Sequence, residues 1–128
     1  MPLVRIDIIE GRDPEQINLL ADTVQQVLIN SFATPELDRY QVIHEHKPGL
    51  IRALDTGLNY PRTNNLVIIQ ITQQGRSTEQ KIAMYREMSK ELEKIGIAPT
   101  DLIISVIRNT KKDWSFGLGR AQFLEGDL

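Results

Sequence analysis

The chain has 128 residues, of which 41% are hydrophobic and 25% charged, and its net charge is −2. These values are ordinary for a globular protein and give no general basic character, so nucleic acid is not expected as a partner. The absence of cysteine excludes disulfides, thiolate nucleophiles and cysteine metal sites, and with no signal-peptide pattern or membrane-spanning apolar run we expect a cytoplasmic protein.

The first predicted strand, residues 3–9, directly follows Pro2. A small second residue allows the initiator Met1 to be removed, which would leave Pro2 as a free secondary amine at the edge of a sheet. An unperturbed α-amino group titrates near pH ~8. Its surroundings therefore decide whether Pro2 acts as a base or as a cation.

A helix and a second strand complete the first half of the chain. Asp13 is the expected N-cap, with Pro14 at the first helical position and Gln16 three residues after the cap. Apolar residues at helical spacing continue to Phe32. Extended structure is then predicted over Tyr40–His46.

The second half repeats this order. Residues 66–73 read as a strand, Ser77 as the cap of a helix with Gln80 three residues later, and Gly96 as the stop signal of that helix. Residues 102–108 form the fourth predicted strand.

The two halves also share sequence. The pattern Gly-Arg-x-x-Glu-Gln begins at Gly11 and recurs at Gly75, an offset of 64 residues. The same offset, without a gap, matches four further pairs: Leu28 with Leu92, Pro35 with Pro99, Val42 with Val106, and Ile43 with Ile107. We interpret this as a duplication within one domain of residues 1–128, with repeats at about 2–46 and 66–110 and a C-terminal segment at 111–128.

These patterns predict an α/β (α+β) fold of two β-α-β units. Each crossover makes its two strands parallel, and the two units form a four-stranded mixed sheet with both helices on one face. The strands at 66–71 and 102–107 are apolar on both sides, as in strands buried on both faces. Because the chain offers no third long helix for the second face, we expect other subunits to cover it in a homo-oligomer.

This topology brings reactive groups to one edge of the sheet. Pro2 and the segment 38–40 lie at the start of two parallel strands, and a two-fold relation between the halves adds residues 73–76. An amine, the carboxylate of Asp38 and the guanidinium of Arg76 would meet there, and the planar fork of arginine suits a carboxylate substrate. Alternatively, Arg76, like its repeat counterpart Arg12, serves only the turn before a helix, and Asp38 only caps a turn.

Two other groups of residues allow a plain structural interpretation. His44 and His46 point to one face of a strand, but without an evident third ligand they favour a structural role over a metal site. Trp114, Phe116 and Phe123 either form part of a functional pocket or belong to the core or a subunit interface.

The duplicated halves with an N-terminal proline resemble the tautomerase superfamily, and within it the malonate semialdehyde decarboxylases. The resemblance covers nearly the whole chain, and its most specific part is the C-terminal tryptophan segment. The matching stretches are residues 2–12, 38–41, 55–58, 101–106, 113–117 and 119–124.

The resemblance implies roles for particular residues. The catalytic proline of the family falls on Pro2, its acidic residue on Asp38, and the second of its two paired arginines on Arg76. The first arginine falls on Gln74, which departs from the family and weakens a carboxylate clamp, although an amide still donates a hydrogen bond. The apolar wall of the substrate pocket falls on Trp114, Phe116 and Phe123.

The implied activity is the decarboxylation, without cofactor or metal, of a small carboxylate-bearing 3-oxo acid, namely malonate semialdehyde to acetaldehyde and carbon dioxide. The implied assembly is a homotrimer. Two other classes stay open: a tautomerase or hydratase acting on another oxo acid, and a non-catalytic oligomeric binding protein.

Overall fold

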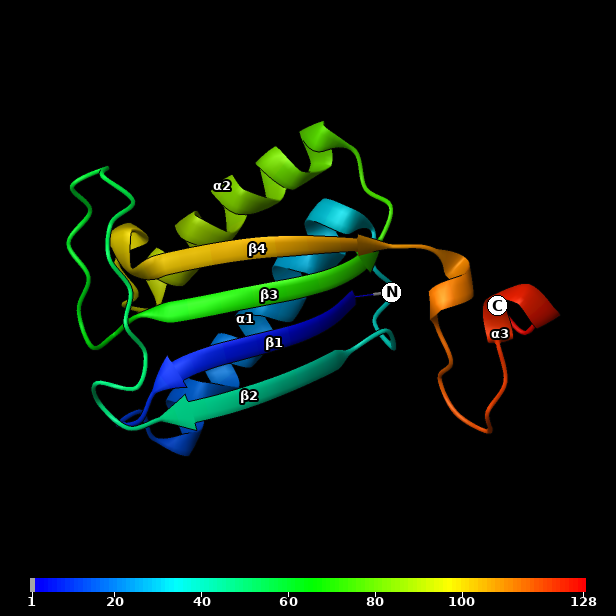
Figure 1. Cartoon of the computed structure of the whole chain (residues 1–128), viewed down its shortest axis with the longest axis horizontal. Helices are drawn as coiled ribbons and strands as arrows, with labels where there is room; N and C mark the ends of the chain where they lie inside the picture. The colour runs from blue at the N-terminus through cyan, green and yellow to red at the C-terminus, as the bar shows by residue number, and fades with distance from the viewer. Residues whose placement is uncertain (1) are drawn as a thin grey trace.

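The structure, a computed structural model, describes residues 2–128 and contains one mixed sheet of four strands in the order β2-β1-β3-β4 (Figure 1). The strands are β1 (Pro2–Ile9), β2 (Tyr40–His46), β3 (Val67–Gln74) and β4 (Leu102–Asn109). The helices are α1 (Pro14–Phe32), α2 (Thr78–Lys94) and the short α3 (Gln122–Glu125), with 3-10 turns η1 (Pro99–Asp101) and η2 (Lys111–Asp113).

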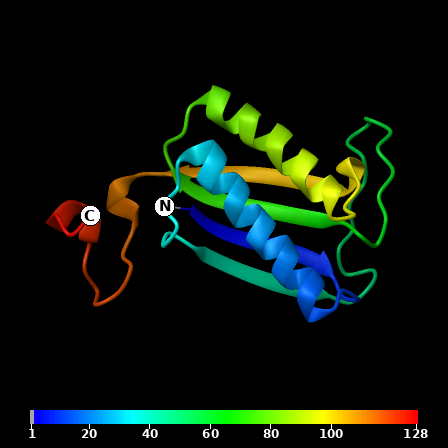
Figure 2. The same cartoon turned by 180° about the vertical axis from the view of Figure 1, so that it is seen from behind.

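The pairing of the strands confirms the predicted α+β fold. β1 runs parallel to β2, β3 runs parallel to β4, and the two pairs meet in an antiparallel contact between β1 and β3. Each half is thus a strand–helix–strand crossover, and both long helices lie on the same face of the sheet (Figure 2).

Local sequence explains where the long helices begin. The Asp13 side chain accepts from the Gln16 backbone at 2.8 Å, and the Gln16 side chain accepts from the Asp13 backbone at 2.9 Å. Ser77 and Gln80 form the same reciprocal pair at 3.1 and 3.0 Å. These capping boxes satisfy backbone N–H groups that the first helical turn leaves without a partner. They confirm both predicted helix starts.

The core lies between the sheet and the two long helices. Alternate residues of β1 and β3 point into it, as the period of two in a strand requires. Its buried side chains from these strands are Val4, Ile6, Ile8, Val67, Ile69 and Ile71. From the helices it takes Leu20, Val24, Val27, Leu28, Phe32, Met84, Met88 and Leu92.

No helix within residues 2–128 covers the opposite face of the sheet (Figure 1). Several apolar side chains on it are exposed by 39 to 50%, namely Leu3, Tyr40, Val42 and Ile107. A polar cluster lies beside them on β1 and β2, where the Asp7 carboxylate accepts from Arg5 at 3.0 Å and lies 2.7 Å from His46 Nε2. The open face is therefore partly apolar and partly charged, rather than uniformly apolar.

The long loop between β2 and β3 lies at the end of the sheet opposite Pro2 (Figure 1). It is fastened to the buried carboxylate of Asp101, which accepts from the Thr63 backbone at 2.7 Å and from the Thr63 hydroxyl. Arg62 adds a bond to the backbone oxygen of Thr100. No helix within the described chain is both long enough and apolar enough to cross a membrane.

Candidate active site

Three strand ends meet at the edge of the sheet that holds Pro2. Pro2 is buried as the first residue of β1 and lies opposite Gln73 in the antiparallel register. The next residue, Leu3, lies opposite Tyr40, which begins β2. The start of β1, the start of β2 and the end of β3 therefore form one rim, which we call the Pro2 edge (Figure 1).

Asp38 lies in the connection that leads from α1 to β2, two residues before Tyr40. Its backbone N–H donates to the Pro35 carbonyl at 3.0 Å, which closes a tight turn, and its side chain is half-buried. Arg39 pairs with Asp22 of α1 at 2.7 Å, which fastens the connection to that helix. Asp38 is thus held at the Pro2 edge, where its predicted acid role stays a prediction.

Arg76 follows β3 at the same edge, and its guanidinium binds backbone. Nη1 donates to the carbonyls of Gln74 and Gly75, both at 2.8 Å, and Nη2 donates to the carbonyl of Phe32 at 3.1 Å. The guanidinium also lies 5.4 Å from the centre of the Phe32 ring. Burial lowers the pKa of Arg76 from its ordinary value. Arg76 therefore joins the turn before α2 to the last residue of α1.

The repeat counterpart Arg12 also donates to backbone before a helix, at the opposite edge of the sheet. Its Nη2 donates to the backbone oxygen of Asn65 at 2.8 Å and to the side-chain oxygen of Asn65 at 2.5 Å. Burial lowers the pKa of Arg12, and the negative charge of Asp101 opposes that shift. Both arginines thus have a structural role before a helix, but only Arg76 stands beside Pro2.

The three aromatic residues predicted to line the pocket lie together. Trp114 and Phe116 stack with ring centres 5.3 Å apart and planes 10° apart, and Phe123 meets Phe116 edge-on at 5.6 Å. Tyr40 also stacks on Phe116, with ring centres 5.7 Å apart. We call these four rings the aromatic wall.

The sequence predicts that Tyr40 lies at the Pro2 edge, but it does not predict that the Tyr40 ring belongs to the aromatic wall. A further residue was not predicted at all. Asn109, the last residue of β4, lies opposite Gln74 in the parallel register, and its Oδ1 accepts from the Trp114 indole at 2.9 Å. The available signal was the position of Asn109 at a strand end that meets the Pro2 edge.

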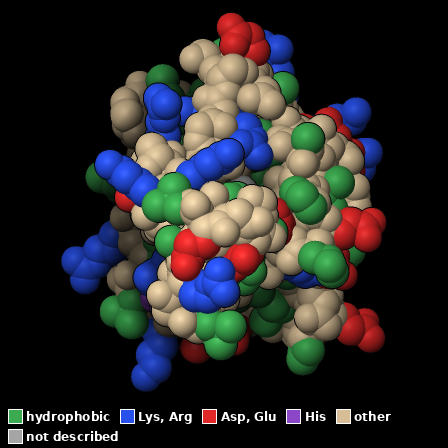
Figure 3. Space-filling view, turned by 90° about the vertical axis from the view of Figure 1, so that its right-hand side faces the viewer, with side chains coloured by type: hydrophobic (Ala, Val, Ile, Leu, Met, Phe, Trp, Pro, Cys, Tyr) green, Lys and Arg blue, Asp and Glu red, His purple; other side chains and the backbone are tan. Residues whose placement is uncertain are grey.

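Viewed from the Pro2 end, the surface mixes hydrophobic, basic and acidic side chains (Figure 3). Among residues 2–128, no three or more histidine or acidic side chains are grouped so as to hold a metal ion. The two histidines named in the sequence belong to the polar cluster of the open face: His46 contacts Asp7, and Arg5 Nη2 lies 3.2 Å from His44 Nδ1.

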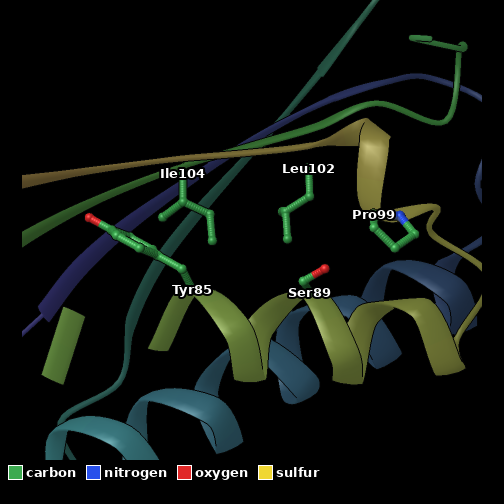
Figure 4. A pocket seen from close by; sticks show the side chains of 5 residues that line it. All are labelled: Tyr85, Ser89, Pro99, Leu102 and Ile104. Carbon is green, nitrogen blue, oxygen red and sulfur yellow. The ribbon is translucent and has the colours of Figure 1, made fainter. Parts of the chain in front are cut away.

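A separate cavity of about 240 Å³ lies between α2 and β4. Figure 4 shows Tyr85 and Ser89 of α2 directed toward Leu102 and Ile104 of β4, with Pro99 at one end. Its lining holds neither a carboxylate nor an amine nor a guanidinium. The predicted site residues Pro2, Asp38, Gln74 and Arg76 instead belong to segments that meet at the Pro2 edge.

Comparisons with known proteins agree with this geometry. Sequence profiles of tautomerase enzymes match residues 2–56 and 38–117. The chain is 47% identical over 129 residues to the probable tautomerase YrdN of Bacillus subtilis (strain 168), with all of both chains covered. This chain therefore belongs to the tautomerase superfamily of enzymes.

Two solved structures extend the comparison. A malonate semialdehyde decarboxylase, studied for its decarboxylase and hydratase activities, matches with a TM-score of 0.95 at 40% identity, over 98% of both chains. A fused 4-OT, which forms a symmetric trimer, matches with a TM-score of 0.78 at 17% identity, over 97% of this chain and 98% of its own. At that identity the second likeness concerns the fold alone.

Proposed function

We propose that this chain is a cofactor-independent decarboxylase of a small 3-oxo acid, with malonate semialdehyde as substrate and acetaldehyde and carbon dioxide as products. The observation that carries the proposal is the gathering of Pro2, Asp38, Gln74, Arg76 and the aromatic wall at one sheet edge. The full-length likeness to a malonate semialdehyde decarboxylase supports it.

The N-terminal amine supplies the electron sink in this proposal. Removal of Met1, which lies outside the described residues, makes Pro2 a secondary ammonium. The ammonium hydrogen-bonds to the 3-oxo oxygen, or the amine condenses with that carbonyl to an iminium. The electron pair of the breaking C1–C2 bond then forms the C2–C3 double bond as carbon dioxide leaves. Protonation at C2 then gives acetaldehyde directly or, where an iminium has formed, gives the iminium of acetaldehyde, which water hydrolyses to acetaldehyde and the free Pro2 amine.

Arg76 holds the substrate carboxylate in place. Its Nη atoms donate to three backbone carbonyls, and in this proposal the same guanidinium, which carries five N–H donors, also donates to the substrate carboxylate. A carboxylate is the better acceptor because the bond joins opposite charges. The aromatic wall lowers the polarity around the leaving group, which favours dispersal of the negative charge as carbon dioxide departs.

Asp38 and Gln74 set the charge of the amine. A nearby carboxylate raises the pKa of an amine and a nearby cation lowers it. Asp38 thus stabilises the ammonium form or positions a water molecule. Gln74, at the position where the family resemblance implies an arginine, leaves the site with one cation fewer. The carboxylate of Asp38 and the missing cation at position 74 both favour a cationic Pro2, which suits decarboxylation or hydration. They disfavour the neutral Pro2 that shuttles protons between keto and enol forms.

A second candidate is a tautomerase or hydratase of another oxo acid. The relative at 47% identity, which is described as a probable tautomerase, supports this candidate. We further propose a homotrimer, in which neighbouring copies cover the exposed Leu3, Val42 and Ile107 of the open face.

Turnover by wild type and Pro2→Ala, with Pro48→Ala in the distant loop as control, tests the function. We expect an intact mass without methionine, turnover of malonate semialdehyde well above that of enol phenylpyruvate, and loss of activity only in Pro2→Ala. Preferred turnover of the enol would favour the tautomerase. Retention of Met1 in most molecules would block the amine and contradict proline chemistry of either kind.

A further inference from the structure

Asn109 stands where the C-terminal segment leaves the sheet. It ends β4 and lies opposite Gln74, which ends β3, so its side chain belongs to the same corner of the sheet as Gln74. Its amide oxygen accepts the indole N–H of Trp114, the only tryptophan in the sequence, at 2.9 Å in a part-buried setting.

The backbone between these two residues is bent to bring them together. The Asp113 carboxylate accepts from the Thr110 backbone N–H and from the Thr110 hydroxyl, both at 2.8 Å. The Asp113 backbone N–H donates in turn to the Thr110 carbonyl at 3.0 Å. The backbone bond and then the hydroxyl bond hold the pKa of Asp113 below its usual value. This closed turn brings Trp114 back to the end of β4, next to Asn109.

The indole then begins a chain of contacts that crosses the Pro2 edge. Trp114 stacks on Phe116, and Phe116 stacks on Tyr40. Asn109 belongs to β4 and Tyr40 to β2, which are the two outer strands of the sheet. The wall therefore extends from one outer strand to the other, past the start of β1 and the end of β3, and the 110–128 segment lies beyond that edge of the sheet in Figure 1.

The middle of the wall, at Phe116, has its own support, whereas its Trp114 end depends on Asn109. The Phe116 backbone N–H donates to the Gln122 side chain at 2.9 Å, and Gln122 donates to the Gly117 carbonyl at 2.8 Å. For Trp114, the side-chain hydrogen bond to Asn109 fixes the rotation of the indole about its own axis. A ring that only stacks retains freedom to slide and turn in its plane, but a ring that also donates a directed hydrogen bond does not.

We propose that Asn109 is a positioning residue for substrate selection. Its amide oxygen locks the Trp114 indole so that the aromatic wall stands close across the Pro2 edge and leaves room for a small oxo acid but not for a bulky one. This inference rests on the proposed function, because it assumes that the substrate binds between Pro2 and the wall.

The test compares Asn109→Ala and Asn109→Asp with the control Asn64→Ala, an exposed asparagine in the distant loop. Because the chain has one tryptophan, its fluorescence reports directly on the indole. In Asn109→Ala we expect emission at longer wavelength and stronger acrylamide quenching. Asn109→Asp keeps an acceptor and should resemble wild type in both signals, as should Asn64→Ala.

Kinetics supply the second measurement. In Asn109→Ala we expect kcat/KM for malonate semialdehyde to fall about 5- to 10-fold, the size that one part-buried hydrogen bond supports. We expect kcat/KM for enol phenylpyruvate to be unchanged or to rise, so that the preference between the two substrates shifts toward the larger one. A loss of stability alone would lower both values together.

The two measurements separate this inference from the proposed function. Unchanged emission and quenching in Asn109→Ala would overturn the role of Asn109, whatever the substrate. Altered fluorescence with an unaltered substrate preference would overturn the claim about selection. If wild type turned over neither substrate, the proposed function would fail. The fluorescence would then still decide whether Asn109 locks the indole, and selection would be rejected with the function.

Discussion

Arg76 and its repeat counterpart Arg12 form a matched pair for separating structure from function. Each precedes a helix and donates to backbone, Arg76 to three carbonyls and Arg12 to the backbone and side chain of Asn65. Replacement by alanine removes these bonds. With hydrogen bonds to charged groups worth about 1.5–3 kcal/mol each and water replacing part of them, we expect each variant to lose about 1–3 kcal/mol of unfolding free energy. For a chain of this size that corresponds to a fall in melting temperature of roughly 4–12 °C.

The functional effects should differ although the structural effects are similar. Arg76 stands at the Pro2 edge, and Arg12 stands at the opposite edge. Loss of a charge-assisted carboxylate contact costs on the order of 2–4 kcal/mol of transition-state binding, which is roughly a 30- to 1000-fold drop in kcat/KM. We expect that drop in Arg76→Ala and almost none in Arg12→Ala, when both are assayed well below their melting temperatures.

The assay is steady-state decarboxylation together with thermal melting of both variants and of Arg76→Lys. Lysine keeps the charge but not the planar fork, so Arg76→Lys should recover part of the kcat/KM and less of the stability. Equal losses of activity in Arg12→Ala and Arg76→Ala would refute a substrate role for Arg76. So would a loss in Arg76→Ala that disappears once the unfolded fraction is subtracted.

Three further outcomes are expected. Burial of Asp7 opposes its charge, but hydrogen bonds from Arg5 and His46 and their charges outweigh burial and hold the pKa of Asp7 below its usual value. The resulting stability is complete above pH ~4 and is lost as the pH falls through that lowered pKa. Asp7→Asn should therefore flatten the dependence of melting temperature on pH below pH ~4, and an unchanged acid profile would contradict this. Gln74→Arg should tighten binding of small carboxylate inhibitors. It should also lower the pKa of the N-terminal amine, as measured by the pH dependence of kcat/KM. Weaker inhibitor binding would count against a carboxylate pocket at the Pro2 edge. Ser77→Ala should cost about 1 kcal/mol of stability by denaturant unfolding without changing kcat/KM, and a change in kcat/KM would mean that the cap also shapes the site.

The fold was predictable because its signals are local. A cap residue with glutamine three positions later is enough to start a helix at Asp13 and at Ser77, and both capping boxes are present. Alternation of apolar residues indicates which face of a strand packs on the helices. The observed strands differ from the predicted ones by a single residue at some ends, such as the start of β1 at Pro2.

The contacts that complete the candidate site are not local, and the sequence offers no rule for them. Phe32 lies 44 residues before Arg76, yet it provides both a carbonyl and a ring to that guanidinium. Tyr40 joins the aromatic wall through Phe116, which comes much later in the chain. Such pairs depend on how segments far apart in the sequence pack together, which propensity and periodicity do not encode.

The repeat clarifies what is particular to the Pro2 edge. The repeated sequence pattern has an arginine before each long helix, and in both halves the guanidinium donates to a backbone carbonyl of a neighbouring segment. A guanidinium that already organises a turn is held in place before any ligand arrives, so its charge is available without a large entropic cost of ordering. At Arg12 the ordered guanidinium has a structural role. Arg76 follows β3 at the Pro2 edge, and with Gln74 uncharged we expect binding of a carboxylate to depend more heavily on Arg76 than it would with a second arginine at position 74.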